Sequence, residues 1–200
     1  MVLFAPEGLA LWRSPLSRAI HRNRSQAHHR FFQLATVTPA GLPANRTVVF
    51  RGFVDQTNRL KMITDRRSEK IDHLTQNNRA EIAWYFTKTR EQFRLAGSVE
   101  TVTDQDVMSV FSEERRRTWQ NISDNARLQF VWPDPAIART SDLGKFSPPA
   151  PDPDYPVDNF VLLVFHPMQV DHLELRGNPQ NRWLYRQNEV GIWQKLAVNP

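Results

Sequence analysis

The chain has 200 residues, no cysteine and a formal net charge of +5, and 40% of its residues are hydrophobic. This composition fits one globular domain and excludes disulfides, thiolate metal sites and cysteine nucleophiles. No apolar run approaches the roughly 20 residues that a membrane-spanning helix needs, and no long basic run is present. We therefore expect no membrane or nucleic-acid partner, although the basic excess favours an anionic partner such as a phosphorylated cofactor. The lack of cysteine fits a cytoplasmic protein.

The first half of the chain predicts a helix followed by short strands. Leu9, Trp12, Leu16 and Ile20 recur at helical spacing and predict a helix over residues 6–21. Turn-forming residues then separate runs that are rich in β-branched and aromatic residues. These runs predict strands over 31–38, 44–53, 60–64, 79–86 and 91–102, with Gly97 as a bulge in the last. A helix is expected after the third strand, with Ser68 as its N-cap.

The second half predicts two helices, a long loop and the most buried strand. We expect helices over 104–119, with Val107, Val110 and Phe111 on one side, and over 123–129. Residues 130–158 form a proline-rich loop, which is long for a compact domain unless it binds something or moves. The apolar run from 159 to 165 predicts a central strand buried on both faces. Three short strands are expected over 170–175, 181–186 and 192–196.

The connections between these strands indicate the fold class. Six to eight strands joined by short turns predict a mainly β fold, an antiparallel barrel or sandwich with flanking helices. We treat residues 1–200 as a single domain, in which residues 1–25 carry the N-terminal helix. There is no Gly-x-Gly-x-x-Gly, no Walker loop and no alternation of strands and helices, which disfavours a Rossmann-type site.

Basic residues crowd the strand–turn–helix predicted over 60–74. A helix N-terminus presents unpaired N–H groups and partial positive charge, and Ser68 adds a hydroxyl. Arg66, Arg67 and Lys70 oppose the helix dipole there unless an anion is bound, which favours a phosphate site. A basic surface turn explains the same residues about equally well. Arg46, at the start of a neighbouring strand, could close over the same phosphate.

Strand alternation separates Arg46 from Arg51. In an extended strand Arg46, Val48 and Phe50 face one side, and Thr47, Val49 and Arg51 face the other. The two arginines therefore cannot enter one pocket unless the strand bulges or ends near Phe50.

Three motifs in this order resemble the FMN-binding core of the pyridoxamine 5'-phosphate oxidase superfamily. They are Arg46-Thr-Val-Val-Phe-Arg51, Ile63-Thr64 followed by Ser68-Glu69-Lys70, and Glu91-Gln92-Phe93-Arg94 followed by Gly97-x-Val99-Glu100. The resemblance covers roughly residues 30–102 and favours the pyridoxamine 5'-phosphate oxidase-related branch over the vitamin B6 oxidase itself. It implies an FMN-binding split β-barrel and a homodimer with two flavins at the subunit interface.

The resemblance also implies roles for single residues. Arg46 and Lys70 would hold the FMN phosphate with Ser68 beside them, and Gln92 would bond the flavin ring. Arg51 stands where the family has a lysine near the flavin and substrate. Arg67 is added from its place in the basic turn. The expected cofactor-binding residues are Arg46, Thr47, Val48, Val49, Arg51, Ile63, Thr64, Arg67, Ser68, Lys70 and Gln92.

The substrate side matches the family less well. The Arg-Leu-His-like segment that grips pyridoxamine phosphate is not found near the C-terminus, and Leu173 stands where a tryptophan over the flavin is expected. We expect Arg127, Gln129 and Trp132 on the substrate side or facing a second subunit, and we assign no catalytic residue. The scattered histidines show no metal-ligand spacing with nearby carboxylates, so no metal site is expected.

These patterns predict an FMN-dependent oxidoreductase that acts on a small molecule or NAD(P)H and works as a homodimer. Three alternatives stay open. They are a flavin-binding or flavin-carrier protein without catalysis, a true pyridoxamine/pyridoxine 5'-phosphate oxidase, and a split-barrel protein that binds haem or a deazaflavin.

Overall fold

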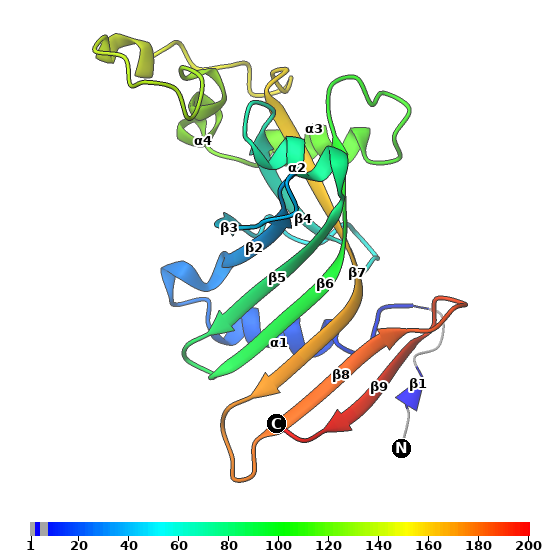
Figure 1. Ribbon diagram of the computed structural model, residues 1–200. Helices are drawn as coiled ribbons and strands as arrows, with labels where there is room; N and C mark the ends of the chain where they lie inside the picture. Colours follow the sequence, from blue (N-terminus) through cyan, green and yellow to red (C-terminus); the bar gives the residue numbers. More distant parts are fainter. Residues whose placement is uncertain (1–2, 5–7) are drawn as a thin grey trace.

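Antiparallel strands make up most of the fold in the computed structural model, which describes residues 3–4 and 8–200 (Figure 1). The strands are β1 (Leu3–Phe4), β2 (Phe31–Val37), β3 (Pro43–Val49), β4 (Leu60–Asp65), β5 (Arg79–Phe86), β6 (Glu91–Val102), β7 (Phe160–Glu174), β8 (Asn181–Gln187) and β9 (Trp193–Val198). The helices are α1 (Arg13–Arg22), α2 (Lys70–Gln76), α3 (Ser112–Gln120) and α4 (Asp124–Leu128). Short 3₁₀ helices span Ala27–Arg30, Gln129–Val131 and Leu143–Phe146. The prediction of a mainly β fold with flanking helices is confirmed.

The barrel closes on β7. This strand pairs with β6 along most of its length, with β4 over its first half and with β8 over its second half. Beyond the end of β3 the chain pairs with β4, because Arg51 N donates to Lys61 O (2.9 Å) and Lys61 N donates to Gly52 O (2.8 Å). The ring β2–β3–β4–β7–β6–β5 is therefore closed, while β8, β9 and β1 continue the sheet away from it.

The core lies inside this ring and under α1. Residues 160–165 of β7 are fully buried, so the predicted central strand is confirmed, although it runs on to Glu174. Large side chains from the N-cap of α1 and from four strands pack in one cluster: Trp12, Phe32, Trp84, Phe93 and Phe165. Burial of each such side chain contributes about 1.5–3 kcal/mol.

Gly97 forms the bulge that the sequence predicts. The register between β6 and β7 shifts between Ala96 and Gly97. A Cβ at Gly97 would overlap the carbonyl oxygen of His166 and lie 2.9 Å from its carbonyl carbon. Only glycine lets the two strands approach so closely here.

The predicted helix over 104–119 is wrong in its first half. Asp106 accepts hydrogen bonds from the backbone N–H and the hydroxyl of Thr103 (2.7 and 2.6 Å), which folds this stretch into turns. Val107 and Val110 are exposed, and α3 begins only at Ser112. Asp competes for backbone groups in this way and favours turns over helix interiors.

Two other predicted helix starts differ from the structure. The helix over 6–21 begins at Arg13, with Leu9 exposed before it; residues 6 and 7 lie outside the described residues. Ser68 does not cap α2, which begins at Lys70 without a side-chain cap. Ser123 does cap α4, because its side chain accepts from Ala126 N. Within the described residues no helix is long and apolar enough to cross a membrane.

Candidate functional site

A cleft of about 650 Å³ lies where β3, β4 and the segment after α4 meet. Its barrel side is formed by Arg46, Thr47, Val48, Val49, Arg51, Ile63, Thr64, Asp65, Arg67 and Lys70. Its other side, the loop wall, is formed by Ala126, Gln129, Phe130, Trp132, Pro133, Asp134, Pro135 and Phe146. Figure 1 shows this segment extending from the α4 end of the barrel. The expected cofactor residues thus come together here, apart from Ser68 and Gln92.

One end of the cleft is cationic and rich in hydroxyls. Lys70 Nζ donates to Thr64 Oγ1 (2.8 Å) and to the hydroxyl of Ser68, which brings Ser68 to the edge of the cleft. Burial, together with the positive charge of Arg46, lowers the pKa of Lys70 to about 8, while Asp65 and Glu69 oppose the change. A buried ammonium with a depressed pKa is stabilised by an incoming anion.

Arg46 is aimed by a hydrogen-bonded chain that starts in α2. Its Nη1 donates to Thr36 Oγ1 (2.7 Å) and to the carbonyl oxygens of Leu34 and Ala44 (both 3.2 Å). The buried Thr36 hydroxyl in turn lies 3.0 Å from His73 Nδ1. The sequence analysis missed this pair, although the β2–β3 hairpin register already sets Thr36 near Arg46.

Arg51 lines the same cleft as Arg46, because β3 ends at Val49 and the alternation of strand faces no longer applies at residue 51. Arg51 follows the regular part of β3, where its N–H already pairs with Lys61 of β4. Burial, and to a smaller extent the charge of Arg30, lowers the pKa of Arg51. Its Nε is buried and has no hydrogen-bond partner among the described residues.

Arg67, by contrast, is already neutralised. Its guanidinium pairs with Asp65 (2.7 Å) and Asp134 (2.8 Å), and it donates to the carbonyl of Trp132 (2.9 Å). Its hydrogen bond to Asp65 raises its pKa. Arg67 therefore fastens the loop wall to the end of β4, and Arg66 pairs with Asp104 away from the cleft.

Two of the three residues expected on the substrate side line the cleft, and the third does not. Gln129 and Trp132 line the cleft, and the Trp132 ring meets Phe146 edge-on at 5.7 Å. Arg127 is buried and does not line it; its guanidinium donates to the carbonyls of Trp119 (3.0 Å) and Ile122 (2.7 Å). Arg127 thus holds the turn between α3 and α4.

Gln92 does not line the cleft of its own chain. It borders a separate hollow on the outward face of β5 and β6, with Phe31, Gln33 and Tyr85. Thr47 borders both hollows, so they adjoin across β3.

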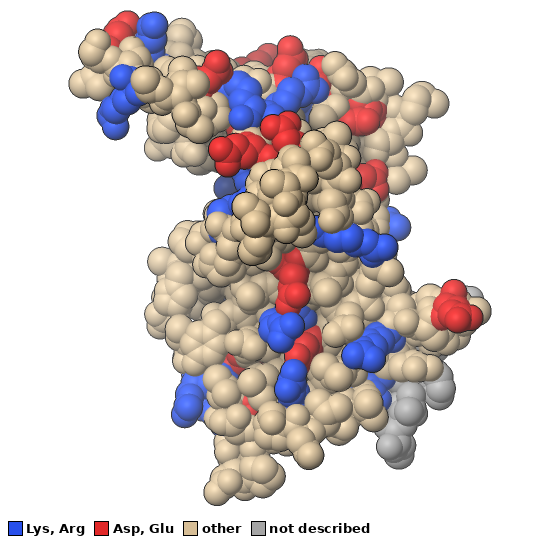
Figure 2. Space-filling view, in the orientation of Figure 1, with Lys and Arg blue, Asp and Glu red and all other residues tan. Residues whose placement is uncertain are grey.

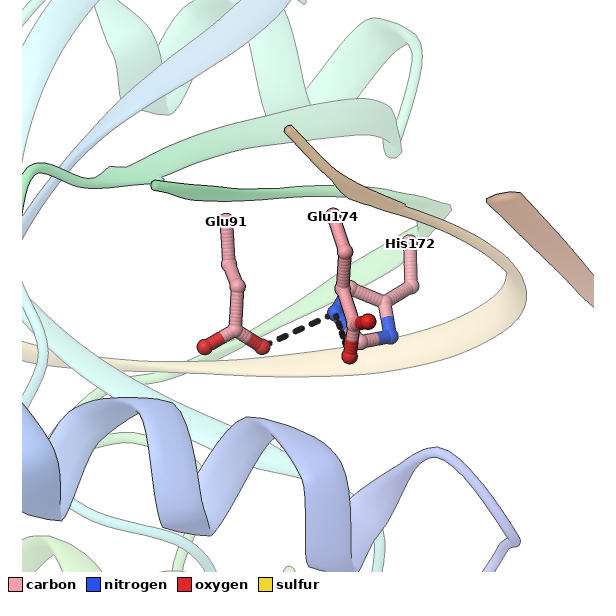
Figure 3. A group of neighbouring side chains, drawn as sticks. All are labelled: Glu91, His172 and Glu174. Carbon is pink, nitrogen blue, oxygen red and sulfur yellow. Dashed lines mark hydrogen bonds and ion pairs between the residues drawn. The ribbon is translucent and has the colours of Figure 1, made fainter. Parts of the chain in front are cut away.

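Strand pairing brings together one group of potential metal ligands that the spacing of histidines in the sequence does not reveal. Strand pairing sets Glu91 opposite Glu174 and brings His172 beside them, with ligand atoms within 4.8 Å (Figure 3). His172 Nε2 lies 3.0 Å from Glu91 Oε2, and its ring stacks on Phe93 at 4.0 Å. Burial acts to raise the pKa of Glu91, but hydrogen bonds from His172 and Thr89 outweigh it, so the pKa is lowered. These contacts account for the cluster as a buried hydrogen-bonded pair.

The chain thus forms a closed split β-barrel with a cationic cleft on its β3–β4 side. The model of the pyridoxamine 5'-phosphate oxidase FMN-binding domain matches residues 9–103. Pyridoxine/pyridoxamine 5'-phosphate oxidase 2 of Arabidopsis thaliana is 34% identical over 96% of this chain and 98% of its own length. The chain therefore belongs to the pyridoxamine 5'-phosphate oxidase-related FMN-binding family.

Solved structures agree with this assignment. A pyridoxamine 5'-phosphate oxidase-related, FMN-binding protein from Nostoc punctiforme is 53% identical, with a TM-score of 0.93 over 96% of this chain and 98% of that one. PhzG from Burkholderia lata shares the fold at 16% identity, with a TM-score of 0.76 over 94% of this chain and 91% of that one. The family implies FMN as the cofactor.

Proposed function

We propose that this protein is an FMN-dependent oxidoreductase that acts on a small organic molecule. The observation that carries the proposal is the charge of the cleft. Arg46, Arg51 and Lys70 line it, and none of them forms an ion pair within the described residues. The two carboxylates of the cleft, Asp65 and Asp134, both pair with Arg67, so the other three cations lack a neutralising partner and call for an anionic ligand. The volume suits a cofactor of FMN size.

The residues present fit FMN at both ends of the cleft. Arg46 and Lys70, with the hydroxyls of Thr64 and Ser68, would hold the phosphate through charge-assisted hydrogen bonds. Val48 and Val49 would lie against the ring. The unpartnered Nε of Arg51 would supply a donor beside it, where positive charge stabilises the reduced ring. When bound, FMN would supply the electron transfer, and the protein would supply orientation and electrostatics.

The outward face of the sheet supports a homodimer. Figure 2 shows acidic and basic side chains alternating down this face, in keeping with the ion pairs from Glu81 through Arg94 and Asp171 to Arg182. Phe31 and Tyr85 are 45% and 46% exposed beside them. A second copy would cover these rings and would place its Gln92 near the adjoining cleft. A flavin-loaded monomer in sedimentation velocity would contradict this arrangement.

A flavin-binding protein without catalysis is the second candidate, and one observation favours it. The only carboxylates that line the described cleft are Asp65 and Asp134, and Arg67 pairs with both. No carboxylate is therefore free to act as a general base. The Arabidopsis relative carries the name of an oxidase, which favours the catalytic reading and makes pyridoxamine 5'-phosphate the first substrate to test.

Flavin binding is tested by absorbance. Purified protein should show the visible spectrum of a flavin, and mass spectrometry of the released ligand should identify FMN. Arg46→Ala combined with Lys70→Ala should abolish co-purification of FMN, whereas Arg186→Ala combined with Lys145→Ala, two exposed cations outside the cleft, should not. Full flavin occupancy in the first double variant would disprove the phosphate assignment.

Catalysis is tested separately on flavin-saturated protein under anaerobic conditions. Bleaching of the flavin by NADPH, NADH or pyridoxamine 5'-phosphate, followed by recovery when oxygen is admitted, would establish an oxidoreductase. Stable yellow protein that none of these donors bleaches would favour the non-catalytic alternative.

A further inference from the structure

A second hollow, of about 440 Å³, lies at the C-terminal end of α1, and it shares no residue with the cleft. It is lined by His21, Arg22, Arg24, Ser25, Lys88, Thr89 and Arg176. Four of these residues carry a fixed positive charge, and no acidic residue lines the hollow. They come from three segments: the end of α1, the β5–β6 turn and the β7–β8 turn.

The scaffold beneath these side chains holds the three segments together. Asn23 is buried; its Nδ2 donates to Ala19 O (2.8 Å) and Thr89 Oγ1 (3.0 Å), and its Oδ1 accepts from Lys88 N (2.9 Å). This single side chain ties α1 to the β5–β6 turn.

The β7–β8 turn is fixed to the same place. Arg176 Nη2 donates to Lys88 O (2.7 Å), and Leu175 N donates to Arg90 O (2.9 Å). These hydrogen bonds hold the backbones of the three segments together, so the four cationic side chains stay close to one another.

The helix dipole explains only part of this charge. The helix dipole stabilises basic residues in a last helical turn, which accounts for Arg22, whereas Arg24 follows the C-cap Asn23. Lys88 and Arg176 stand on hairpin turns, where no dipole favours them. Four positive charges also outweigh the roughly half negative charge of a helix end.

Neighbouring carboxylates do not neutralise the hollow either. None of Arg22, Arg24, Lys88 and Arg176 forms an ion pair in the described part of the chain. Glu91, the acidic residue that follows this turn, is buried and bonded to His172.

We propose that this basic hollow is a second anion site that binds a small phosphorylated molecule. The side chains of Arg22 and Lys88 form no hydrogen bonds among the described residues, so their donors are available to phosphate oxygens, and Ser25 adds a hydroxyl. Arginine forks bind phosphate oxygens in pairs, which favours a phosphomonoester over a simple halide. The volume suits a small ligand. The site is independent of the flavin cleft and of the proposed function.

The test is isothermal titration calorimetry at low ionic strength with phenyl phosphate and with inorganic phosphate. The Arg46→Ala, Lys70→Ala double variant, which disables the cleft, should still bind phenyl phosphate. Adding Arg22→Gln and Arg176→Gln should weaken that binding at least about tenfold. The control, Arg186→Gln with Lys145→Gln, removes the same charge elsewhere and should change it less than about twofold.

Three results would overturn the proposal. They are no saturable binding of phenyl phosphate in the cleft-disabled variant, an equal loss in the control, or tight binding of a single-stranded DNA 20-mer with none of phenyl phosphate. The last would make the hollow part of a surface for polyanions. Circular dichroism checks that each variant is folded. If the variant with Arg176→Gln unfolds, the combination of Arg22→Gln and Lys88→Gln is tested in its place.

Discussion

The lowered pKa of Lys70 predicts that FMN affinity falls as the pH rises above about 8. In the free protein burial and the charge of Arg46 bring this pKa down from 10.5 to about 8. Bound phosphate would stabilise the ammonium and raise the pKa again. Above the free pKa, binding must therefore take up a proton, and each pH unit costs about 1.4 kcal/mol, or about tenfold in affinity.

The effect should be visible between about pH 7 and about pH 9. Lys70 changes from mostly charged to mostly neutral in this range, so the Kd for FMN should rise about tenfold. The other charged groups around it are Arg46, Asp65 and Glu69, and none of these residue types ordinarily titrates there. A phosphate monoester, with a second pKa near 6, is already fully ionised through most of the range.

Fluorescence titration of flavin-free protein measures this dependence, and three comparisons isolate Lys70. Riboflavin lacks the phosphate and should bind with a flat profile. Lys70→Met should weaken FMN binding about 10–100-fold at neutral pH, the loss of a hydrogen bond to a charged group, and flatten the profile. Lys70→Arg keeps the charge and should bind FMN with little pH dependence. A flat profile for FMN with the unaltered protein, or the same slope for riboflavin, would refute the reasoning.

Three further predictions concern residues that support the cleft and the barrel. Thr36→Val removes the hydroxyl that positions Arg46 and should raise the Kd for FMN about fivefold. Thr36→Ser keeps the hydroxyl and should leave this Kd unchanged. Unchanged binding in the valine variant would show that the remaining contacts of Arg46 suffice. Gly97→Ala would press a methyl group against the carbonyl of His166 and should lower the free energy of unfolding by about 1–3 kcal/mol, measured by urea denaturation. An unchanged urea midpoint would mean that the bulge relaxes freely. Arg67→Ala should speed amide hydrogen exchange in the loop wall but not in β7, and uniform exchange in both would contradict its role as a fastener.

Much of the barrel follows from local sequence signals. β5 and β6 begin and end where the alternation of apolar residues predicts, and the run of six apolar residues at 160–165 marks the strand that three others share. The cationic end of the cleft also follows from the sequence, because Ser68 and Lys70 lie at one turn and Arg46 lies on a neighbouring strand. These signals are short-range, so strand and turn preferences suffice to read them.

The remaining parts depend on side-chain contacts that strand and helix patterns do not specify. Arg67 looked like a phosphate ligand because its partner Asp134 lies far along the chain. His172 and Glu91 showed no metal-ligand spacing, since only the β6–β7 pairing brings them together. Val107 and Val110 had helical spacing, but a local carboxylate turn at Asp106 prevailed over it. In each case the deciding contact involves a side chain whose partner the local pattern does not specify.

Both acidic residues of the cleft are paired with Arg67, and this limits the reactions that the proposed oxidoreductase could catalyse. Asp65 and Asp134 are held by Arg67, and Lys70, whose pKa is lowered to about 8, lies at the cationic end of the cleft among Thr64 and Ser68. A donor that must lose a proton to a side chain while it is oxidised therefore finds no base beside the ring position. A donor that gives up hydride directly, such as NAD(P)H or an amine already in its neutral form, needs none. For an amine the rate of flavin reduction should then follow the pKa of the free amine, and a rate governed instead by a protein group near pH 6 would point to a base that this cleft does not supply.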